Sequence, residues 1–271
     1  MREFLDLVLN MPAWQKLAVV IFSLSLSWLL EAWNPLFKFN YDKVRHGITN
    51  LSLFLWMSLI NFFFGLFLVY GLGFFQSSGF GLLQIISLPL WFEFVLSLLI
   101  LDFIAQYVIH VCLHKIPWMW KFHMIHHSDE HLDATSGTRH HPVDYLLREI
   151  YSFIALVLLG IPAAYYFTFR LFTIFFTYIN HANVSVPAWL NQSLSWIFVT
   201  PDLHKIHHHR KQAWTDRNYG NIFSFWDRIF GTLIEADSRD VEYGLDSLDE
   251  GFDASAKDLL LLPWKKGDTH E

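Results

Sequence analysis

The chain has 271 residues, of which 54% are hydrophobic and only 16% are charged, whereas roughly 25% of residues are charged in ordinary soluble domains. The formal net charge is −6 and the basic residues form no stripe, which excludes a typical nucleic-acid-binding protein. A single cysteine, Cys112, excludes an internal disulfide and a cysteine-ligated zinc cluster. Of 15 histidines, 13 lie between His110 and His209, so one kind of metal-binding side chain is concentrated in the middle of the chain.

The first part of the chain predicts helices in a membrane. The N-terminal residues alternate charged and apolar side chains without the apolar core of a signal peptide, so they predict a short amphipathic helix on the membrane surface. A helix needs about 20 apolar residues to cross the hydrocarbon core of a bilayer. Residues 17–33, 48–70 and 88–109 each predict such a span, with the glycine-rich stretch 71–81 separating the last two.

The next apolar stretch, 150–180, is interrupted by Gly160 and Pro162 and predicts a membrane hairpin of two short helices. A hairpin returns the chain to the face from which it entered, so the histidines before and after it are expected on one side. Lys and Arg are frequent in the histidine-bearing segments and in loop 38–45, but absent from the connection 71–87. The positive-inside tendency then predicts a cytoplasmic histidine face, in a bacterial inner membrane or the endoplasmic reticulum.

The chain is therefore expected to be an all-α, polytopic membrane protein with three long spans, a helical hairpin and a cytosol-facing, histidine-rich helical cap. Three regions are predicted. Membrane helices occupy 1–109, a histidine-rich catalytic region that includes the hairpin occupies 110–235, and a polar C-terminal tail occupies 236–271.

Three histidine groups share spacings of three and four residues. On a helix these spacings place imidazoles on one face, where they can bind the same ion, whereas the adjacent His126 and His127 point about 100° apart and suit two neighbouring metals. Eight such imidazoles exceed the four ligands of a tetrahedral zinc site, so the sequence predicts a two-metal centre. The predicted ligands are these eight and His181, which the hairpin returns to the cluster: His110, His114, His123, His126, His127, His181, His204, His207 and His208.

Other residues are candidates for a place around this centre. His141 is expected either to bind a metal or to contact a residue that does, and His140 is a weaker candidate. A ligating imidazole needs an acceptor for its other N–H, and the candidates for that role are Asp102, Asp129, Asp133, Asp216, Asp227 and Asn218. Asp102 stands out because it lies within a hydrophobic span, on the same helical face as the first ligand.

The remaining polar residues receive no role in metal binding. His46 is expected to be a hydrogen-bonded structural residue, and His131 and His209 are expected to lie outside the ligand set. Glu93 and Arg170 fall within predicted membrane segments, and the sequence assigns them no partner.

At these residues the chain resembles the fatty acid hydroxylase/sterol desaturase superfamily. The segment TDRNYGNIFSFWDRIFGT at 215–232 also resembles the sterol desaturase and alkylglycerol monooxygenase branches. The matching elements are HVCLH at 110–114, HMIHH at 123–127, the isolated His181 in NHAN, HKIHH at 204–208, and TDRNYGNIFSFWDRIFGT at 215–232.

The resemblance implies a non-haem di-iron oxidoreductase that uses O2 to hydroxylate or desaturate an aliphatic C–H of a lipid, such as a sterol, a fatty acyl chain or an alkylglycerol. It implies two Fe ions, which Zn can replace in a purified form. Electrons would come from a separate donor of the cytochrome b5, ferredoxin or reductase type. Some branches use a further histidine beside the position of His181. This chain has no histidine there, so that ligand is either absent or supplied from elsewhere, with His141 as the candidate.

The sequence motifs alone are also compatible with two other functions. A membrane zinc hydrolase would use metal-bound water, but it is expected to need an acid/base carboxylate near the histidines, and no HExxH motif is present. A metal-binding transporter would place its ligands near the middle of the membrane, whereas these histidines fall in polar stretches at its edge. The sequence does not choose between hydroxylation and desaturation, because both begin with the same hydrogen abstraction.

Overall fold

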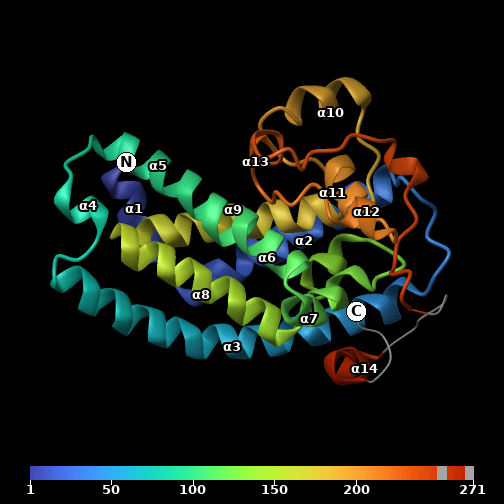
Figure 1. Cartoon of the computed structure of the whole chain (residues 1–271), viewed down its shortest axis with the longest axis horizontal. Helices are drawn as coiled ribbons and strands as arrows, with labels where there is room; N and C mark the ends of the chain where they lie inside the picture. The colour runs from blue at the N-terminus through green and yellow to red at the C-terminus, as the bar shows by residue number, and fades with distance from the viewer. Residues whose placement is uncertain (249–254, 266–271) are drawn as a thin grey trace.

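The computed structural model describes residues 1–248 and 255–265. These residues form helices and turns, together with two isolated β-bridges. The long helices lie side by side along the longest axis of the molecule, and short histidine-bearing helices gather at one end (Figure 1). The long helices are α2 (Ala13–Trp33), α3 (Lys43–Ser77), α5 (Leu90–Asp102), α8 (Pro142–Leu159) and α9 (Ala163–His181).

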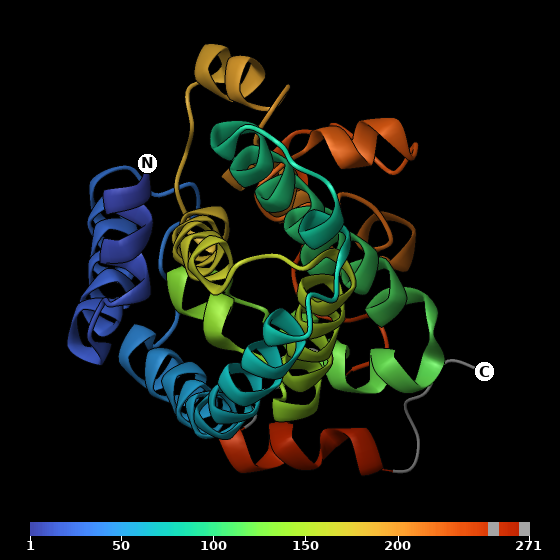
Figure 2. The same cartoon turned by 90° about the vertical axis from the view of Figure 1, so that its left-hand side faces the viewer.

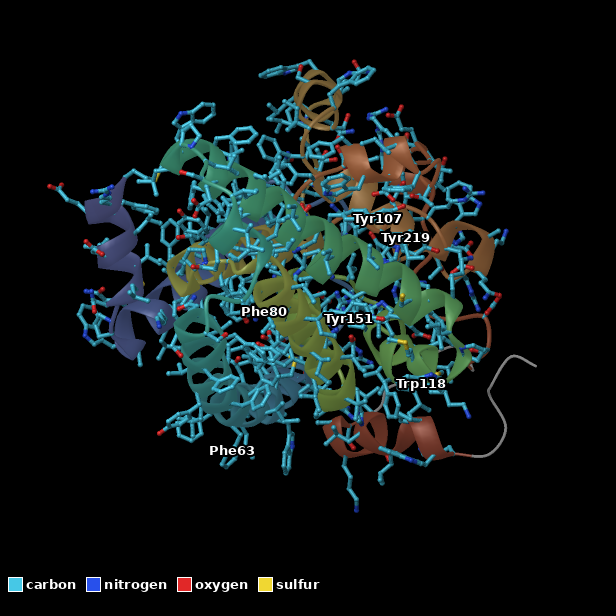
Figure 3. All side chains as sticks on the ribbon, turned by 60° about the vertical axis from the view of Figure 1, so that its left-hand side comes forward. Phe63, Phe80, Tyr107, Trp118, Tyr151 and Tyr219 are labelled. Atoms are coloured by element: carbon cyan, nitrogen blue, oxygen red, sulfur yellow. The ribbon has the colours of Figure 1, made fainter. Side chains whose placement is uncertain are left out.

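Three helical stretches are long and apolar enough to cross a membrane, namely Ala13–Trp33, Lys43–Ile85 and Leu90–Lys115. They include the first two predicted spans, and the third begins two residues later than predicted and extends to Lys115. Large apolar side chains point outward from them, as Phe63 does with 61% of its surface exposed (Figure 3). Because soluble monomers rarely expose apolar surface on this scale, the three stretches indicate a multi-pass integral membrane protein.

The glycine-rich connection is shorter than the sequence predicted. Helix α3 continues through Gly71 to Ser77, and the chain turns only at Gly79 and Gly81, which have φ of 69° and 123°. A Cβ on Gly71 would lie 2.8 Å from the ring of Phe153 in α8. This glycine therefore allows two helices to approach closely instead of ending the first one.

Gly81 lies against the turn between α8 and α9. A Cβ there would lie 2.4 Å from the Cα of Gly160, and its φ of 123° is a conformation that L-residues rarely adopt. Backbone strain of this kind costs about 1–3 kcal/mol, and the clash adds to it. We expect Gly81→Ala to lower the thermal midpoint of the detergent-solubilised protein, measured by scanning fluorimetry.

The matched control is Gly73→Ala in α3, where an added Cβ meets nothing within 4 Å. An alanine in mid-helix is favoured over glycine by about 0.5–1 kcal/mol, so this change should leave the midpoint unchanged or raise it. Equal midpoints for the two variants would contradict the close approach of Gly81 to Gly160.

Helices α8 and α9 are joined by a short turn within the predicted apolar stretch 150–180, and both extend beyond it. Gly160 ends α8 in the left-handed conformation with φ of 68°, and the N–H of Ile161 bonds to the carbonyl of Leu156, as at many helix ends. Pro162 then precedes α9. Seen along the bundle, α9 lies beside α2, and α8 lies beside α3 (Figure 2).

Proline begins several helices at the histidine-bearing end of the bundle. It occupies the first turn of α7 (Pro117–His127), of α8 and of α11 (Pro201–His207). Proline suits this position because its φ is already helical and its missing N–H would have no partner there. Each of these three helices therefore has a defined starting point, including α7 and α11, which carry histidines of the predicted ligand set.

Other short elements complete the two ends of the bundle. Helices α1 (Arg2–Leu9) and α4 (Leu82–Ile85) lie at the end far from the histidines (Figure 1). The short helices that follow α9 lie near the histidine-bearing end: α10 (Ala188–Leu194), α12 (Gln212–Thr215) and α13 (Phe225–Ile229).

Part of the predicted polar tail packs against the bundle. Helix α14 (Ala256–Leu261) contacts α3, and the turn that follows it contacts α7. Its Leu259 is fully buried in a cluster with Leu53 and Ile125. Residues 249–254 and 266–271 of this tail lie outside the described part of the chain.

Candidate metal centre

The nine histidines predicted as ligands lie in two buried groups. Within each group the ring nitrogens lie within 4.8 Å of one another. The five-histidine group consists of His110, His114, His123, His127 and His207. The four-histidine group consists of His126, His181, His204 and His208.

Adjacent histidines are divided between the two groups. His126 at the end of α7 belongs to the four-histidine group, whereas His127 belongs to the five-histidine group. At the end of α11 the order is reversed, with His207 in the five-histidine group and His208 in the four-histidine group. The two groups are close neighbours, because the rings of His127 and His208 stack with centroids 4.5 Å apart.

A π-helical turn lies just before the first two ligands. Helix α5 continues into a π-helical segment, Phe103–Val108, and then into α6, Ile109–Lys115. Such a turn holds more residues than an α-helical turn and is frequent at functional sites. The π-helical turn rotates the helix that follows it. The rings of His110 and His114 therefore point to the five-histidine group and away from the helix face occupied by Asp102.

The histidines of α7 and α11 are buried, and burial disfavours their charged form. Burial lowers the pKa of His123 to about 3. Burial and the neighbouring histidines hold the pKa of His127, His207 and His208 well below the usual value. These imidazoles are therefore neutral at pH 7, which is the form that binds a metal.

Hydrogen bonds to backbone carbonyls decide which nitrogen carries the proton. The Nδ1 of His110 lies 2.7 Å from the carbonyl oxygen of Tyr219, and the Nδ1 of His207 lies 2.7 Å from that of Arg217. A carbonyl oxygen only accepts, so in a neutral imidazole Nδ1 donates and Nε2 keeps a free lone pair. These two Nε2 atoms lie 3.1 Å apart, where two lone pairs repel unless a cation lies between them.

The four-histidine group has the same arrangement. His181 donates from Nδ1 to the carbonyl of Thr177 at 2.7 Å. Its Nε2 lies 3.1 Å from that of His126, 3.0 Å from that of His204 and 3.2 Å from that of His208. Nitrogens bound at right angles to one ion at about 2.0–2.1 Å lie about 3 Å apart. The residues of each group therefore fit one metal ion.

Asp144 is a further residue of the centre that the sequence did not single out. Its carboxylate is fully buried and accepts from Nδ1 of His123 at 3.0 Å, Nδ1 of His140 at 2.8 Å and Nε of Arg148 at 3.0 Å. The bond to His123 leaves Nε2 of that ring facing the five-histidine group. The available signal was its place in the first turn of α8, two residues after Pro142 and close behind His140 and His141.

Asp216 contacts His114, the second predicted ligand on α6, as Asp144 contacts His123. Its Oδ1 lies 3.3 Å from Nδ1 of His114, and its Oδ2 accepts from Lys115 at 2.7 Å. The Nε2 of His114 is buried and has no hydrogen-bond partner among the described residues. This nitrogen is the one available to the five-histidine group.

The predicted acceptors Asp102, Asp227 and Asn218 contact no ligand histidine directly. Asp102 accepts from the indole N–H of Trp226 at 3.0 Å. Asp227 accepts from the backbone N–H of Tyr219 at 2.8 Å, and Asn218, with φ of 53°, donates to two backbone carbonyls. Asp227 and Asn218 thus fix the loop whose Tyr219 carbonyl accepts from His110.

The other histidines lie outside both groups. His141 caps α8, because its Nδ1 accepts from the N–H of Val143 at 3.0 Å. His46 bonds to Asp129 and Asp133, in agreement with a structural role. His131 and His209 each pack against an aromatic ring and belong to neither group.

A cavity of about 480 Å³ begins at the histidines and follows α9. Its wall at this end contains ligands of both groups, and its wall along α9 extends from His181 to Tyr166. Apolar side chains of α2 and α3, including Leu17 and Phe64, form the opposite wall. Leu17, one of these lining side chains, is 52% exposed.

Residues 94–232 match the family model described as fatty acid hydroxylase, and this stretch is just over half of the chain. The chain belongs to the fatty acid hydroxylase family. The matched stretch contains all nine histidines of the two groups, Asp144, and the loop with Tyr219. The part before it contains α2 and α3, which contribute apolar residues to the cavity wall.

Several curated members of this family are similar to the chain. Ornithine lipid hydroxylase OlsE from Rhizobium tropici is 34% identical over 145 residues, which are 54% of this chain and 43% of that protein. Alkylglycerol monooxygenase from Homo sapiens is 32% identical over 144 residues, 52% of this chain and 30% of that protein. Cholesterol 25-hydroxylase-like protein from Danio rerio is 26% identical over 139 residues, 50% of this chain and 53% of that protein.

The similarity thus covers less than half of the length of the first two hydroxylases, and about half of the third. No solved structure matches this member of the family.

Proposed function

We propose that the chain is an O2-dependent hydroxylase or desaturase that acts on an aliphatic C–H of a membrane lipid. The observation that carries this proposal is the cavity, which runs along α9 to His126, His181 and His204. Its largely apolar walls suit a hydrocarbon chain, and its end lies at the predicted metal ligands. Family membership and the lipids that the relatives are named for support a lipid as the substrate.

The nine histidines are proposed to bind two iron ions. Bound iron would supply the oxidising power that side chains lack. The residues of the chain do the remaining work. Carbonyls and Asp144 hold the proton on Nδ1, which keeps the Nε2 lone pairs directed at each group, and full burial excludes bulk water from the site.

The placement in the membrane is also a proposal. We infer that α8 and α9 cross the membrane as a hairpin, because they run beside the three candidate spans (Figure 1). The histidine-bearing end is proposed to face the cytoplasm, where Lys115, Lys121 and Lys211 follow the positive-inside tendency. A separate redox protein would then deliver electrons from that side.

Metal analysis and O2 consumption test the proposed chemistry. The purified chain is expected to contain two iron ions per molecule, measured by plasma mass spectrometry, and to consume O2 only when a reductant and a lipid are present. Stoichiometric zinc without reductant-dependent O2 uptake in iron-reconstituted protein would contradict the proposal and would favour a zinc hydrolase.

The substrate can be identified by comparing cells that express the wild type with cells that express His126→Ala. We expect one oxidised or unsaturated lipid to disappear from the lipid mass spectra of the variant, because His126 is a ligand of the four-histidine group. Identical lipidomes, with both proteins present at equal levels, would contradict an oxidase function in those cells.

A further inference from the structure

A charged cluster lies between α8 and α9, away from the histidines. Arg170 and Glu149 form an ion pair at 3.1 Å. Arg170 also donates to the hydroxyl of Tyr145 at 2.7 Å, and the hydroxyl of Tyr166 donates to Glu149 at 2.5 Å. Charged residues inside a membrane bundle are costly, and they frequently mark the path of a substrate.

All four residues of this cluster line the cavity that ends at the histidines. Glu149 is almost completely covered, whereas the side chain of Arg170 keeps 21% of its surface exposed. A guanidinium has five N–H donors, and the bonds to Tyr145 and Glu149 engage only part of them. Arg170 therefore presents donors to whatever occupies the cavity.

Along α9, the cluster is separated from His181 by a largely apolar part of the cavity wall. Arg170 precedes His181 by eleven residues on α9, which is about 16 Å at the rise of an α-helix. Ile174 and Tyr178 line the cavity between them. A molecule that contacts both ends must therefore be long and largely apolar, with one polar group.

The charges of the cluster indicate what kind of polar group fits. The positive charge of Arg170 is already balanced by Glu149, the nearby Arg148 is balanced by Asp144, and Lys16, which also lines the cavity, lies over the ring of Phe167 at 4.2 Å. A carboxylate or phosphate would add a negative charge beside Glu149, which is unfavourable in a site of low dielectric constant. A neutral oxygen accepts from the free donors of Arg170 without this cost.

We propose that this cluster binds a neutral oxygen-bearing group of an acyl or alkyl lipid, namely an ester, amide, ether or hydroxyl oxygen. The hydrocarbon chain then extends along α9, and a carbon further along that chain reaches the histidines. The inference rests on the proposed function and deepens it. By holding the polar oxygen of the lipid, Arg170 determines which carbon of the hydrocarbon chain lies at the histidines.

Binding of matched probes tests the inference in the detergent-solubilised full chain, without reductant. The probes are methyl hexadecanoate, hexadecanoate and hexadecane, each used to displace a fluorescent alkyl lipid. A hydrogen bond to a charged group contributes about 1.5–3 kcal/mol, so the wild type should bind the ester about 10- to 100-fold more tightly than hexadecane. It should also bind the ester more tightly than the carboxylate.

The test variant replaces both charges, Arg170→Met with Glu149→Met, because removing one would leave the other buried without a partner. It should bind the ester and hexadecane equally, with the affinity for hexadecane unchanged. Tyr165→Phe is the matched control, since its hydroxyl bonds to Glu93 and the residue does not line the cavity. This control should retain the preference of the wild type.

A second variant covers the case in which the double variant fails to fold. Tyr145→Phe keeps both charges and removes the hydroxyl that holds Arg170, and it should reduce the preference for the ester about 3- to 10-fold. Equal binding of ester and hexadecane by the wild type, or tighter binding of hexadecanoate, would overturn the inference. Normal binding without any oxidation of the ester would contradict the proposed function alone.

Discussion

Replacing His208 by alanine is expected to reduce the metal content of the purified chain from two ions to one or none. The Nε2 of His208 lies 3.2 Å from the Nε2 atoms of both His181 and His204, so its loss leaves the four-histidine group with three imidazoles. Activity should fall by more than the 10- to 100-fold that follows the loss of an outer hydrogen-bond partner. Plasma mass spectrometry and lipid turnover measure the two effects.

The adjacent His209 gives a control within the same motif. Its Nδ1 accepts from the N–H of Lys211 and its ring packs on Trp214, away from both groups. His209→Ala should therefore keep both metal ions and most of the activity. The assignment of ligands would be refuted if His208→Ala retained two ions, or if both variants lost metal equally.

Asp144→Asn is expected to have the second-largest effect, because one buried carboxylate holds His123, His140 and Arg148. An amide cannot accept all three bonds and leaves Arg148 without its counter-charge. Loss of one partner of a buried ion pair costs about 3–5 kcal/mol, and loss of a ligand's outer acceptor weakens metal binding about 10- to 100-fold. Thermal scanning and competition with a chelator measure stability and affinity.

Glu235→Gln is the control for this change, since it also removes the carboxylate partner of an arginine. The pair between Glu235 and Arg228 lies at the surface, with 63% of the Glu235 side chain exposed, and such pairs contribute about 0–1 kcal/mol. Its stability and metal affinity should match those of the wild type. Unchanged metal affinity in Asp144→Asn would show that the carboxylate does not position His123.

The sequence predicted the three spans because lipid imposes a strong requirement for apolar length. It misplaced the end of α3 for a physical reason. Gly71 resembles a helix breaker in sequence, but in the structure it makes room for the ring of Phe153 on α8. Whether a glycine ends a helix or permits a close helix contact depends on the neighbouring helix, which a local pattern does not contain.

The gathering of the nine predicted ligands could be expected from helical spacing and from the return of the chain at 160–162. Of their hydrogen-bond partners, only Asp216 was among the candidates. The carbonyls of Tyr219, Arg217 and Thr177 accept from three ligands, and a backbone carbonyl has no signature in the side-chain sequence. Asp102 was favoured over Asp144 because it lies on the expected face of a straight α-helix, whereas the π-helical turn after it changes that face.

The partners of the charged residues inside the bundle could also be identified only from the structure. Glu93 accepts from the hydroxyl of Tyr165 at 3.1 Å, and Arg170 pairs with Glu149. Each pair joins two different helices. Their contact depends on which helices lie side by side and on how each is rotated, and neither follows from the composition of a single span.

The division of adjacent histidines between the two groups would make the two proposed ions interdependent. Helices α7 and α11 each contribute to both groups, so an ion in either group would fix the orientation of two helices that the other ion also needs. Order gained at the first binding event would not have to be gained again at the second, which would favour uptake of the second ion. Chains with no ion and chains with two ions would then be favoured over half-filled ones, and the supply of metal during assembly would control the amount of doubly loaded protein.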